Sequence, residues 1–518
     1  MQLIDFFERG LSYGVGAPCL QEPQGRTLSY GQVAELTHRI ANGLREAGID
    51  RHCQVGLLGN NHLMTMVAVL GIVRSGGIWL PVNARNSAEE NVNILSRGGC
   101  EFLFIHSAFE EQLPLLKAAM PNLRGIVCLD RALDSAPLLE AWALEQSVAE
   151  FRSDAQSDDV VAIRGTGGTT GLPKGVMVTH RVYCAIVANW FGAMPVSDRP
   201  VHLAVAPLSH ATGAVAFMTM IHGGVTIVMD KSEPGAILAA IQDFRVTQLF
   251  LPPTAIYKLL GHPQVRLFDY SSLRYFIYSA APMSVERLRE SLSIFGPVMI
   301  QSYGQAEAPF IATCLTPQDH VDILQDEALL HRLASCGRPS PLARVAIAAP
   351  DGTLLGPDER GEIVIQSDLV MKGYFRDPEK TAEALRGGWL HTGDVGFRDR
   401  DGFIYIVDRL KDLIVSGGFN ISPGEIEQLL WAVPAISDCA VVGVPDPLWG
   451  EAVKAVVELR PGATLDIEAT LKMCKERLGS IKAPKSLEVW PQLPRSSVGK
   501  VLKREIRDRF WVGQARQV

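Results

Sequence analysis

The ten residues 166–175, with the sequence TGGTTGLPKG, constrain this chain more than any other stretch. Four glycines and three threonines exclude a core element, and they follow the apolar run 160–163, which is typical of a buried strand. Glycine lets backbone N–H groups turn toward a ligand, while threonine hydroxyls and Lys174 add donors and a positive charge. The pattern predicts a polyphosphate-binding loop with the residues Thr166, Gly167, Gly168, Thr169, Thr170, Gly171 and Lys174. A flexible surface loop is disfavoured, because the lysine and the threonines lie so close to the glycines.

This loop differs from the Walker A phosphate loop. A Walker A loop requires G-x-x-x-x-G-K-[ST], with the lysine directly after a glycine and at the start of a helix. Here Lys174 follows Pro173, so a kinase or a P-loop ATPase fits poorly.

Length, net charge and cysteine spacing limit the classes of protein to which this chain can belong. A chain of 518 residues is too long for one compact core, so we expect two or more domains. Its net charge of −7 argues against a nucleic-acid partner, which usually meets a basic surface. The nine cysteines include no C-x-x-C pair, so neither a zinc site nor a disulfide framework is indicated.

The sequence also predicts a cytoplasmic protein without an integral membrane segment. Residues 1–8 lack the basic and long apolar regions of a signal peptide. The apolar stretch 67–73 ends at Arg74 and is too short to span a bilayer. Scattered cysteines are simplest to explain as free thiols in a reducing compartment.

Strands and helices alternate along the first part of the chain. Ser29 is a plausible N-cap for a helix over 30–47, and residues 55–60, 62–75 and 78–83 are typical of a strand, a helix and a strand. The alternation returns at 202–260 and 273–300, which predicts two α/β layers side by side with the phosphate loop between them. From about 337, short β runs with Asp-Gly turns predict a small β subdomain. Residues beyond 408 carry their own helix and strand signals, so we expect a further domain of about 110 residues.

Two more segments carry candidate site residues. Tyr303 and Glu307 follow an apolar strand ending at Ile300, at the edge where α/β sheets bind ligands. An aromatic face can stack on a base, and a carboxylate can bind Mg²⁺. Asp394 follows a glycine turn, and its carboxylate can accept hydrogen bonds from two ribose hydroxyls. Taken alone, Asp394 could equally be a turn residue that bonds its own backbone.

Together these motifs resemble those of the adenylate-forming superfamily, which contains acyl-CoA synthetases, firefly luciferase and peptide-synthetase adenylation domains. Residues 166–175 are similar to its T-S-G-T-T-G-x-P-K-G loop, 303–307 to Y-G-x-T-E, 392–394 to T-G-D, 408–409 to D-R and 494–500 to P-x-x-x-x-G-K. The resemblance covers essentially the whole chain and is strongest to ligases that join fatty or aryl acids to CoA. Gly167 and Ala306 replace the serine and threonine of the family, so either the binding mode has shifted or activity is reduced; we favour retained activity.

The resemblance implies a domain plan. It implies a large N-terminal AMP-binding domain over 1–408, made of two α/β layers and a β subdomain at about 337–408. A small, mobile α+β domain would follow over 409–518, with a hinge near Lys411. A homodimer is left open.

The resemblance also implies the reaction and its cofactors, ATP, Mg²⁺ and coenzyme A. A carboxylate attacks the α-phosphate of ATP, giving an acyl-adenylate and pyrophosphate, and a thiol then displaces AMP. The implied catalytic residues are Lys174 on the phosphates, Glu307 on Mg²⁺ and Lys500 in the first step only. The implied nucleotide-binding residues, beside those of the phosphate loop, are Ser302, Tyr303, Gly304, Gln305, Asp394, Arg409 and Lys500. Gly417 and Gly418 would admit the pantetheine arm of CoA after the hinge rotates.

The acid is less well specified. His210, Gly213, Ala280 and Ala281 stand in the segments that line the acyl pocket of the family. No aspartate is present there to pair with an ammonium group, so an amino acid is disfavoured, and the small residues suit a fatty, aryl or polycyclic acid. His210 could equally be structural. Two further possibilities stay open beside a CoA ligase: a synthetase that loads a carrier protein, and a catalytically silent binding protein of the same fold.

Overall fold

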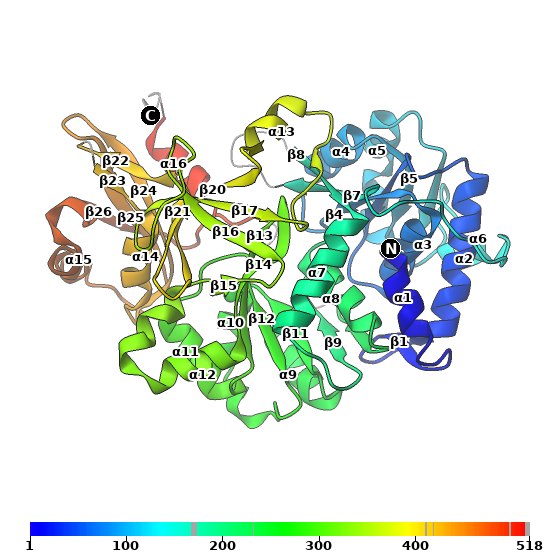
Figure 1. The fold of residues 1–518 in the computed structure, drawn as a ribbon, viewed down its shortest axis with the longest axis horizontal. Coiled ribbons are helices and arrows are strands. Elements are labelled where there is room, and N and C mark those ends of the chain that lie inside the picture. Colours follow the sequence, from blue (N-terminus) through cyan, green and yellow to red (C-terminus); the bar gives the residue numbers. More distant parts are fainter. Residues whose placement is uncertain (167–173, 231–232, 410–411, 418, 497–498, 513–518) are drawn as a thin grey trace.

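The structure is a computed structural model, which describes residues 1–166, 174–230, 233–409, 412–417, 419–496 and 499–512. Figure 1 shows that the C-terminal strands and helices gather at one end of the molecule, beside the strands β16 (Ala343–Ala348), β17 (Gly361–Ser367), β20 (Trp389–Arg398) and β21 (Ile404–Arg409). The predicted combination of a large N-terminal α/β part and a smaller C-terminal part is confirmed. Within the described residues, no helix is both long and apolar enough to cross a membrane.

A nine-stranded sheet forms the first α/β layer. Its inner strands run parallel, and β13 pairs antiparallel with β14 across a tight turn at Ala306 and Glu307, so the 303–307 motif spans the end of β13 and this turn. In spatial order the strands are β15 (Arg338–Pro339), β14 (Ala308–Leu315), β13 (Met299–Gln305), β12 (Tyr275–Tyr278), β11 (Gln248–Leu251), β9 (Val201–Ala204), β10 (Val225–Val228), β1 (Pro18–Gln21) and β2 (Thr27–Ser29).

A seven-stranded sheet forms the second layer. In order its strands are β18 (Gly373–Tyr374), β8 (Lys174–Thr179), β7 (Val160–Thr166), β4 (Ile78–Val82), β3 (Gln54–Leu58), β5 (Cys100–Ile105) and β6 (Gly125–Cys128). The phosphate loop itself lies outside the described residues, but the strands on either side of it, β7 and β8, pair antiparallel with each other. The segment directly after the loop is therefore a strand.

Helices cover the two sheets and lie between them. The fully buried helix α3 and the helices α7 and α8 contribute to one apolar core that both sheets share. Ser29 forms the expected N-cap, in a complete capping box at the start of α2. The helices of this part are α1 (Ile4–Leu11), α2 (Tyr30–Glu46), α3 (Leu63–Ser75), α4 (Ala88–Arg97), α5 (Leu113–Ala119), α6 (Leu139–Leu144), α7 (His180–Ala193), α8 (Ala211–Met220), α9 (Pro234–Asp243), α10 (Pro253–Leu260), α11 (Val285–Phe295), α12 (Pro317–Gln325) and α13 (Pro378–Ala384).

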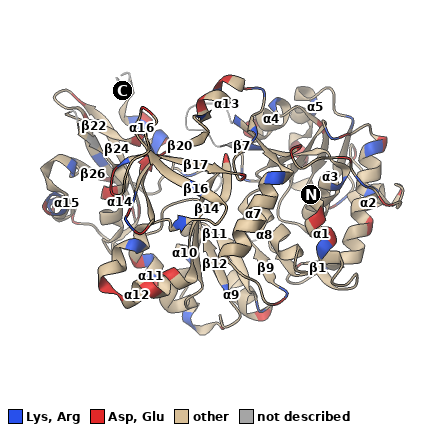
Figure 2. Ribbon diagram, in the orientation of Figure 1, with Lys and Arg blue, Asp and Glu red and all other residues tan. Residues whose placement is uncertain are grey.

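Two smaller sheets complete the chain. The first joins β16, β17, β20, β21 and β19 (Leu385–Arg386), whereas two short segments of the same region add to the large sheets as β15 and β18. The second comprises β23 (Phe419–Ile421), β22 (Ile414–Ser416), β25 (Gly450–Leu459), β24 (Ile436–Asp446) and β26 (Ser486–Val489). Helices α14 (Pro423–Trp431), α15 (Ile467–Lys482) and α16 (Lys503–Phe510) pack on it, around an apolar core of its own. Figure 2 shows acidic and basic residues interspersed over the outer helices, while the inner strands are mostly uncharged.

Candidate active site

Three predicted nucleotide-binding residues meet at one buried carboxylate. The hydroxyl of Tyr303 donates a hydrogen bond of 2.7 Å to Oδ2 of Asp394. Nε of Arg409 lies 3.1 Å from the other oxygen, Oδ1. Both Asp394 and Tyr303 are buried, and burial together with the neighbouring carboxylate raises the pKa of Tyr303 well above its ordinary value. The tyrosine therefore stays a hydrogen-bond donor, and Asp394 is held from two sides.

The sheets bring these residues together. Tyr303 lies near the carboxyl end of β13 in the nine-stranded sheet, whereas Asp394 and Arg409 face each other across the antiparallel pair β20 and β21. The backbone N–H of Asp394 also donates to the Thr392 hydroxyl at 3.1 Å. The cluster therefore forms where the end of β13 meets the antiparallel pair β20 and β21.

Lys500 lies in the same neighbourhood although it comes from the C-terminal part. The adjacent glycine, Gly499, approaches α10 so closely that an added Cβ would lie 3.1 Å from the Thr254 hydroxyl. The ammonium group is within electrostatic range of Asp394 and Arg409, although the residue as a whole remains exposed. Its pKa is lowered to about 8, first by the loss of solvent around the charge and then by the guanidinium of Arg409.

A second cluster links the residues predicted to bind phosphates and metal. The Tyr374 hydroxyl donates to Oε1 of Glu307 at 2.8 Å, and Nζ of Lys174 lies 4.6 Å from the centre of the Tyr374 ring. One aromatic side chain thus contacts both candidate catalytic residues. Sequence reasoning missed Tyr374, because its strand β18 is only two residues long and can be recognised as a strand only from its pairing with β8.

Glu307 suits a metal ion that is shared with a nucleotide. Its Oε1 accepts the Tyr374 hydroxyl, and within the part of the chain that the structure describes, no further hydrogen bond to its carboxylate is recorded. The described residues hold no cluster of three or more metal-ligating side chains. Mg²⁺ is commonly bound by one or two carboxylates together with substrate phosphates rather than by a protein cage. The donor set therefore fits Mg²⁺ bound to a polyphosphate.

The rest of the 302–306 segment is tightly packed. Ser302 is buried, and its hydroxyl has no recorded partner within the described residues. An added Cβ on Gly304 would lie 2.7 Å from the Ala308 carbonyl oxygen, so the turn requires glycine. Nε2 of Gln305 lies 3.4 Å from the Thr392 carbonyl oxygen, and the half-buried Ala306 packs against the large apolar core. Ala306 is thus accommodated by apolar packing.

His210 is held in a polar cluster at the start of α8. The Asn83 amide donates to its Nε2 at 3.0 Å. Its pKa is lowered to about 4, first by burial and then by Arg164 and Arg85, so the imidazole is neutral at pH 7. The half-buried Arg164 donates a long hydrogen bond of 3.4 Å to the Ser209 carbonyl oxygen, and no ion pair to either arginine is recorded within the described ranges. Sequence reasoning overlooked Arg164, although a charged residue directly after the apolar run 160–163 was a visible signal.

The other predicted acyl-pocket residues lie on two elements. Gly213 is buried in α8, where an added Cβ would lie 2.2 Å from the Leu208 carbonyl oxygen, so close packing alone explains this glycine. Ala280 is exposed and has a left-handed backbone with φ of 72°, which is unusual for alanine. Ala281 follows it and is half-buried. A left-handed alanine just after β12 marks a backbone position that the surrounding structure must enforce.

Gly417 lies beside the exposed indole of Trp449. Its φ is 56°, and an added Cβ would lie 2.4 Å from the Trp449 ring. Phe419 and Trp449 keep about half of their surface exposed, at 54% and 50%. Glycine is therefore required here both by the backbone conformation and by the indole that lies against it.

Seven predicted residues fall outside the part of the chain that the structure describes. They are Gly167, Gly168, Thr169, Thr170, Gly171, the hinge residue Lys411 and Gly418. Thr166 ends β7, directly opposite Lys174 in the antiparallel pairing. The strands on either side therefore fix where the phosphate loop starts and ends.

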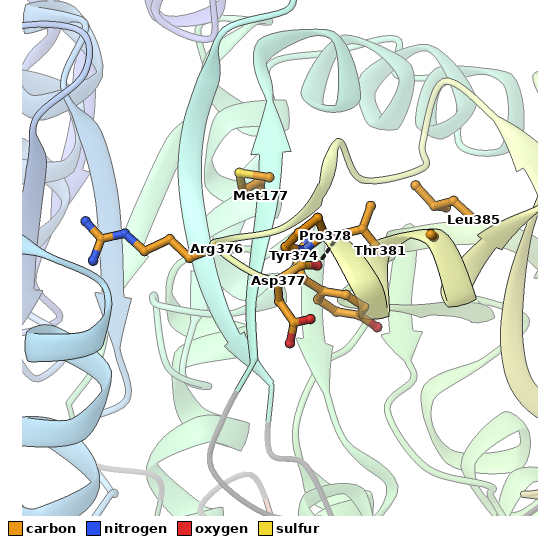
Figure 3. Close-up of a pocket in the computed structure, with 8 residues that line it drawn as sticks. Met177, Tyr374, Arg376, Asp377, Pro378, Thr381 and Leu385 are labelled. Carbon is orange, nitrogen blue, oxygen red and sulfur yellow. Dashed lines mark hydrogen bonds between the residues drawn. The ribbon is translucent and has the colours of Figure 1, made fainter.

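A surface pocket of about 410 Å³ lies beside the cluster formed by Lys174, Glu307 and Tyr374. Its lining comes from β8, β18 and α13: Met177, Tyr374, Arg376, Asp377, Pro378, Thr381, Ala382 and Leu385. Figure 3 shows the Tyr374 ring and the Asp377 carboxylate extending away from Met177, while the Arg376 side chain extends in the opposite direction, away from the other labelled residues. Tyr374 thus closes one side of the pocket while its hydroxyl reaches Glu307.

Comparison with protein families identifies two matching regions. Residues 6–375 match the family described as AMP-binding enzyme, and residues 425–500 match the AMP-binding enzyme C-terminal domain. The two matches leave 376–424 between them, the region that contains Asp394, Arg409 and Gly417.

Relatives and solved structures agree with this family. A feruloyl-CoA synthase from Amycolatopsis is 37% identical over 489 residues, which cover 94% of each chain. The medium/long-chain fatty acid–CoA ligase FadD8 of Mycobacterium tuberculosis is 36% identical over 95% of this chain and 87% of its own. The structure of the amide bond synthetase McbA from Marinactinospora thermotolerans superposes with a TM-score of 0.88 at 29% identity, covering 98% of this chain and all of that one.

Proposed function

Because the chain belongs to the family of AMP-binding enzymes, we propose that it is an ATP-dependent ligase that joins a hydrophobic carboxylic acid to coenzyme A. The observation that carries this proposal is the buried carboxylate of Asp394, which Tyr303 and Arg409 hold and which Lys500 approaches from the C-terminal part. Four residues from four separated segments thus converge where the resemblance predicts one nucleotide.

In the first half-reaction the acid carboxylate attacks the α-phosphate of ATP, and pyrophosphate leaves. Asp394 and Arg409 would hold the ribose, while Lys174 would neutralise the β- and γ-phosphates. Lys500 would stabilise the charge that builds up between the attacking carboxylate and the α-phosphate. Glu307 would hold Mg²⁺, which supplies charge neutralisation for the phosphates when bound.

The pocket for the acid would lie between the start of α8 and the turn after β12. Ala280 and Ala281 have small side chains, and the neutral imidazole of His210 carries no charge that would repel an apolar group. The guanidinium of Arg164 offers donors to the acid carboxylate near Ser209. A fatty, aryl or polycyclic acid suits this arrangement. Relatives named for ferulate and for medium and long fatty chains support the same range without selecting one acid.

In the second half-reaction a thiol displaces AMP. We propose that the C-terminal domain, residues 409–518, rotates about Lys411 so that Gly417 and Gly418 face the site. The exposed indole of Trp449 beside Gly417, and the exposed Phe419 two residues further along the chain, would offer apolar surface to the pantetheine arm. These contacts favour a thiol acceptor with a long, thin arm.

A second acceptor class is supported by one comparison. The similarity to an amide bond synthetase makes an amine a second candidate for the group that displaces AMP. Two more possibilities stay open: the thiol of a carrier protein as acceptor, and a silent binding protein of the same fold.

One product analysis separates these four possibilities. The enzyme, ATP, Mg²⁺ and a set of acids are incubated with CoA, with a holo carrier protein or with a simple amine. Pyrophosphate release that depends on the acid excludes the silent protein, and the acceptor that yields product identifies the class. A thioester formed with CoA alone supports the proposal, while product only with a carrier or an amine contradicts it.

A further inference from the structure

The segment 371–375 ties together the two elements that carry Lys174 and Glu307. The backbone N–H of Met371 donates to the Glu307 carbonyl oxygen at 2.7 Å. Two residues on, Gly373 pairs with Met177 and Tyr374 with Val176 of β8. The N–H of Phe375 then donates to the Gly175 carbonyl oxygen at 2.7 Å. This five-residue segment, called the strap below, therefore spans from the strand after the phosphate loop to the turn after β13.

The side chain of Tyr374 makes a second connection between the two elements that the strap joins. It is 7% exposed, its hydroxyl donates to Glu307 Oε1 at 2.8 Å and its ring lies under the Lys174 ammonium at 4.6 Å. The backbone N–H of Tyr374 is fixed in turn by the Thr381 hydroxyl at 2.9 Å. The hydroxyl and the face of the Tyr374 ring thus each contact a charged group, and the Tyr374 backbone is anchored by Thr381.

From this geometry we infer that Tyr374 is a positioning residue that orients the Glu307 carboxylate for the metal and the Lys174 ammonium for the phosphates. The inference rests on the proposed function. A hydroxyl on Oε1 leaves Oε2 for the metal ion and prevents the carboxylate from turning. A ring beneath the ammonium limits a flexible lysine side chain to one direction, because the π face attracts the cation. Tyr374 contacts neither nucleotide nor metal in this assignment, and it acts through its two partners.

Two variants separate the two contacts. Tyr374→Phe removes the hydroxyl but keeps the ring, whereas Tyr374→Leu removes both. Tyr275→Phe is the matched control, since its hydroxyl also donates to one oxygen, that of Pro195 at 2.8 Å, at the opposite end of its sheet strand from the site. Thermal unfolding of all three variants checks that the fold is retained.

The measured quantities are the affinities of each variant for Mn²⁺ and for a nucleotide analogue, in the absence of any carboxylic acid substrate. Mn²⁺ serves as a paramagnetic substitute for Mg²⁺, and free Mn²⁺ is measured by electron paramagnetic resonance in the presence of the non-hydrolysable analogue α,β-methylene-ATP. The analogue alone, with EDTA, is titrated by calorimetry. Tyr374→Phe should weaken Mn²⁺ binding by roughly tenfold, since it removes a hydrogen bond to a charged group. Its affinity for the metal-free analogue should stay at the parent value, whereas Tyr374→Leu should lower that affinity by roughly threefold or more.

A double-mutant cycle tests whether Tyr374 acts through Glu307. In a Glu307→Gln background, Tyr374→Phe should change Mn²⁺ affinity little further. Equal losses of Mn²⁺ affinity in both backgrounds would overturn the inference, as would parent-like binding by Tyr374→Phe or an equal loss in Tyr275→Phe. An enzyme that binds Mn²⁺ and the analogue as expected but forms no adenylate with any acid would instead contradict the proposed function and leave this inference standing.

Discussion

The hydroxyl of Tyr303 lies 2.7 Å from Oδ2 of Asp394, although the two residues are 91 positions apart in the sequence. The same carboxylate faces Nε of Arg409 at 3.1 Å through its other oxygen. Each member of this trio stands in a separate motif, and the fold joins them at one buried point.

Asp394→Asn should raise the KM for ATP by roughly tenfold or more, because the amide lacks the negative charge that faces Arg409 and that would accept hydrogen bonds from the ribose hydroxyls. The amide keeps the volume of the side chain, so the fold should be preserved. KM for ATP is measured by pyrophosphate release at a saturating acid concentration. Asp401→Asn is the control, since Asp401 is 62% exposed and pairs with Arg332 away from this cluster. An unchanged KM, or an equal rise in the control, would contradict the assignment.

Lys500→Ala should lower formation of the acyl-adenylate by roughly a hundredfold or more, because the cation that stabilises the transition state is removed. Formation of thioester from a supplied acyl-adenylate should be spared. The two half-reactions are measured separately, by pyrophosphate release and by thioester formation. Equal losses in both would show that Lys500 serves the fold or both steps rather than adenylation.

The pH dependence of adenylation should report the titration of Lys500. Its pKa is lowered to about 8, so the ammonium form prevails below about pH 7 and is lost as the pH rises through 8. Since the role requires the charged form, kcat/KM for ATP should fall over this window. Lys500→Arg keeps its charge throughout and should lack this fall, whatever its absolute rate. A fall that persists unchanged in Lys500→Arg would assign the titration to another group.

Gly417→Ala should slow thioester formation by roughly tenfold and leave adenylation near the parent rate. The added Cβ would lie 2.4 Å from the Trp449 ring, so the indole must move from the surface proposed for the thiol arm. Gly462→Ala is the matched control, because Gly462 also has a positive φ, of 74°, but no atom lies within 4 Å of its added Cβ. Similar thioester rates in the two variants would show that backbone strain, not the Trp449 contact, is responsible.

Lys411→Pro should separate the half-reactions. Proline fixes φ near roughly −65° and restricts the preceding residue, so the rotation between the two steps should be blocked. Pyrophosphate release in a single turnover should survive while thioester formation collapses. Lys411→Ala, which keeps the torsional freedom, should support both steps. If Lys411→Pro still forms thioester near the parent rate, the pivot lies elsewhere.

The sequence predicted the type of fold and most of the residues of the Asp394 cluster. Asp394, Arg409 and Tyr303 stand in short motifs, and short motifs can be recognised locally. Their hydrogen bonds could not be predicted from residue spacing, because they depend on how the turn after β13 meets the pair β20 and β21. The role of Gly213 in the acyl pocket stays a prediction, because its contact with the Leu208 carbonyl oxygen would by itself require glycine.

Tyr374 and Arg164 were missed for physical reasons. Tyr374 lies in a two-residue strand whose partners, β8 and the turn after β13, are distant in the sequence. No local periodicity can reveal such pairing. Arg164 did leave a signal, since a charged side chain near the end of an otherwise apolar strand must find either a partner or a ligand. The partner, the Ser209 carbonyl oxygen, again comes from another segment.

The central claim is that this chain activates a carboxylic acid with ATP. The direct measurement is pyrophosphate release in the presence of Mg·ATP and single acids, taken from aryl, fatty and polycyclic classes, with Lys500→Ala as the background. The account predicts that at least one acid gives release well above this background, and that AMP and the CoA thioester then form in equal amounts when CoA is added. Pyrophosphate release that no acid increases over the background of Lys500→Ala would contradict it.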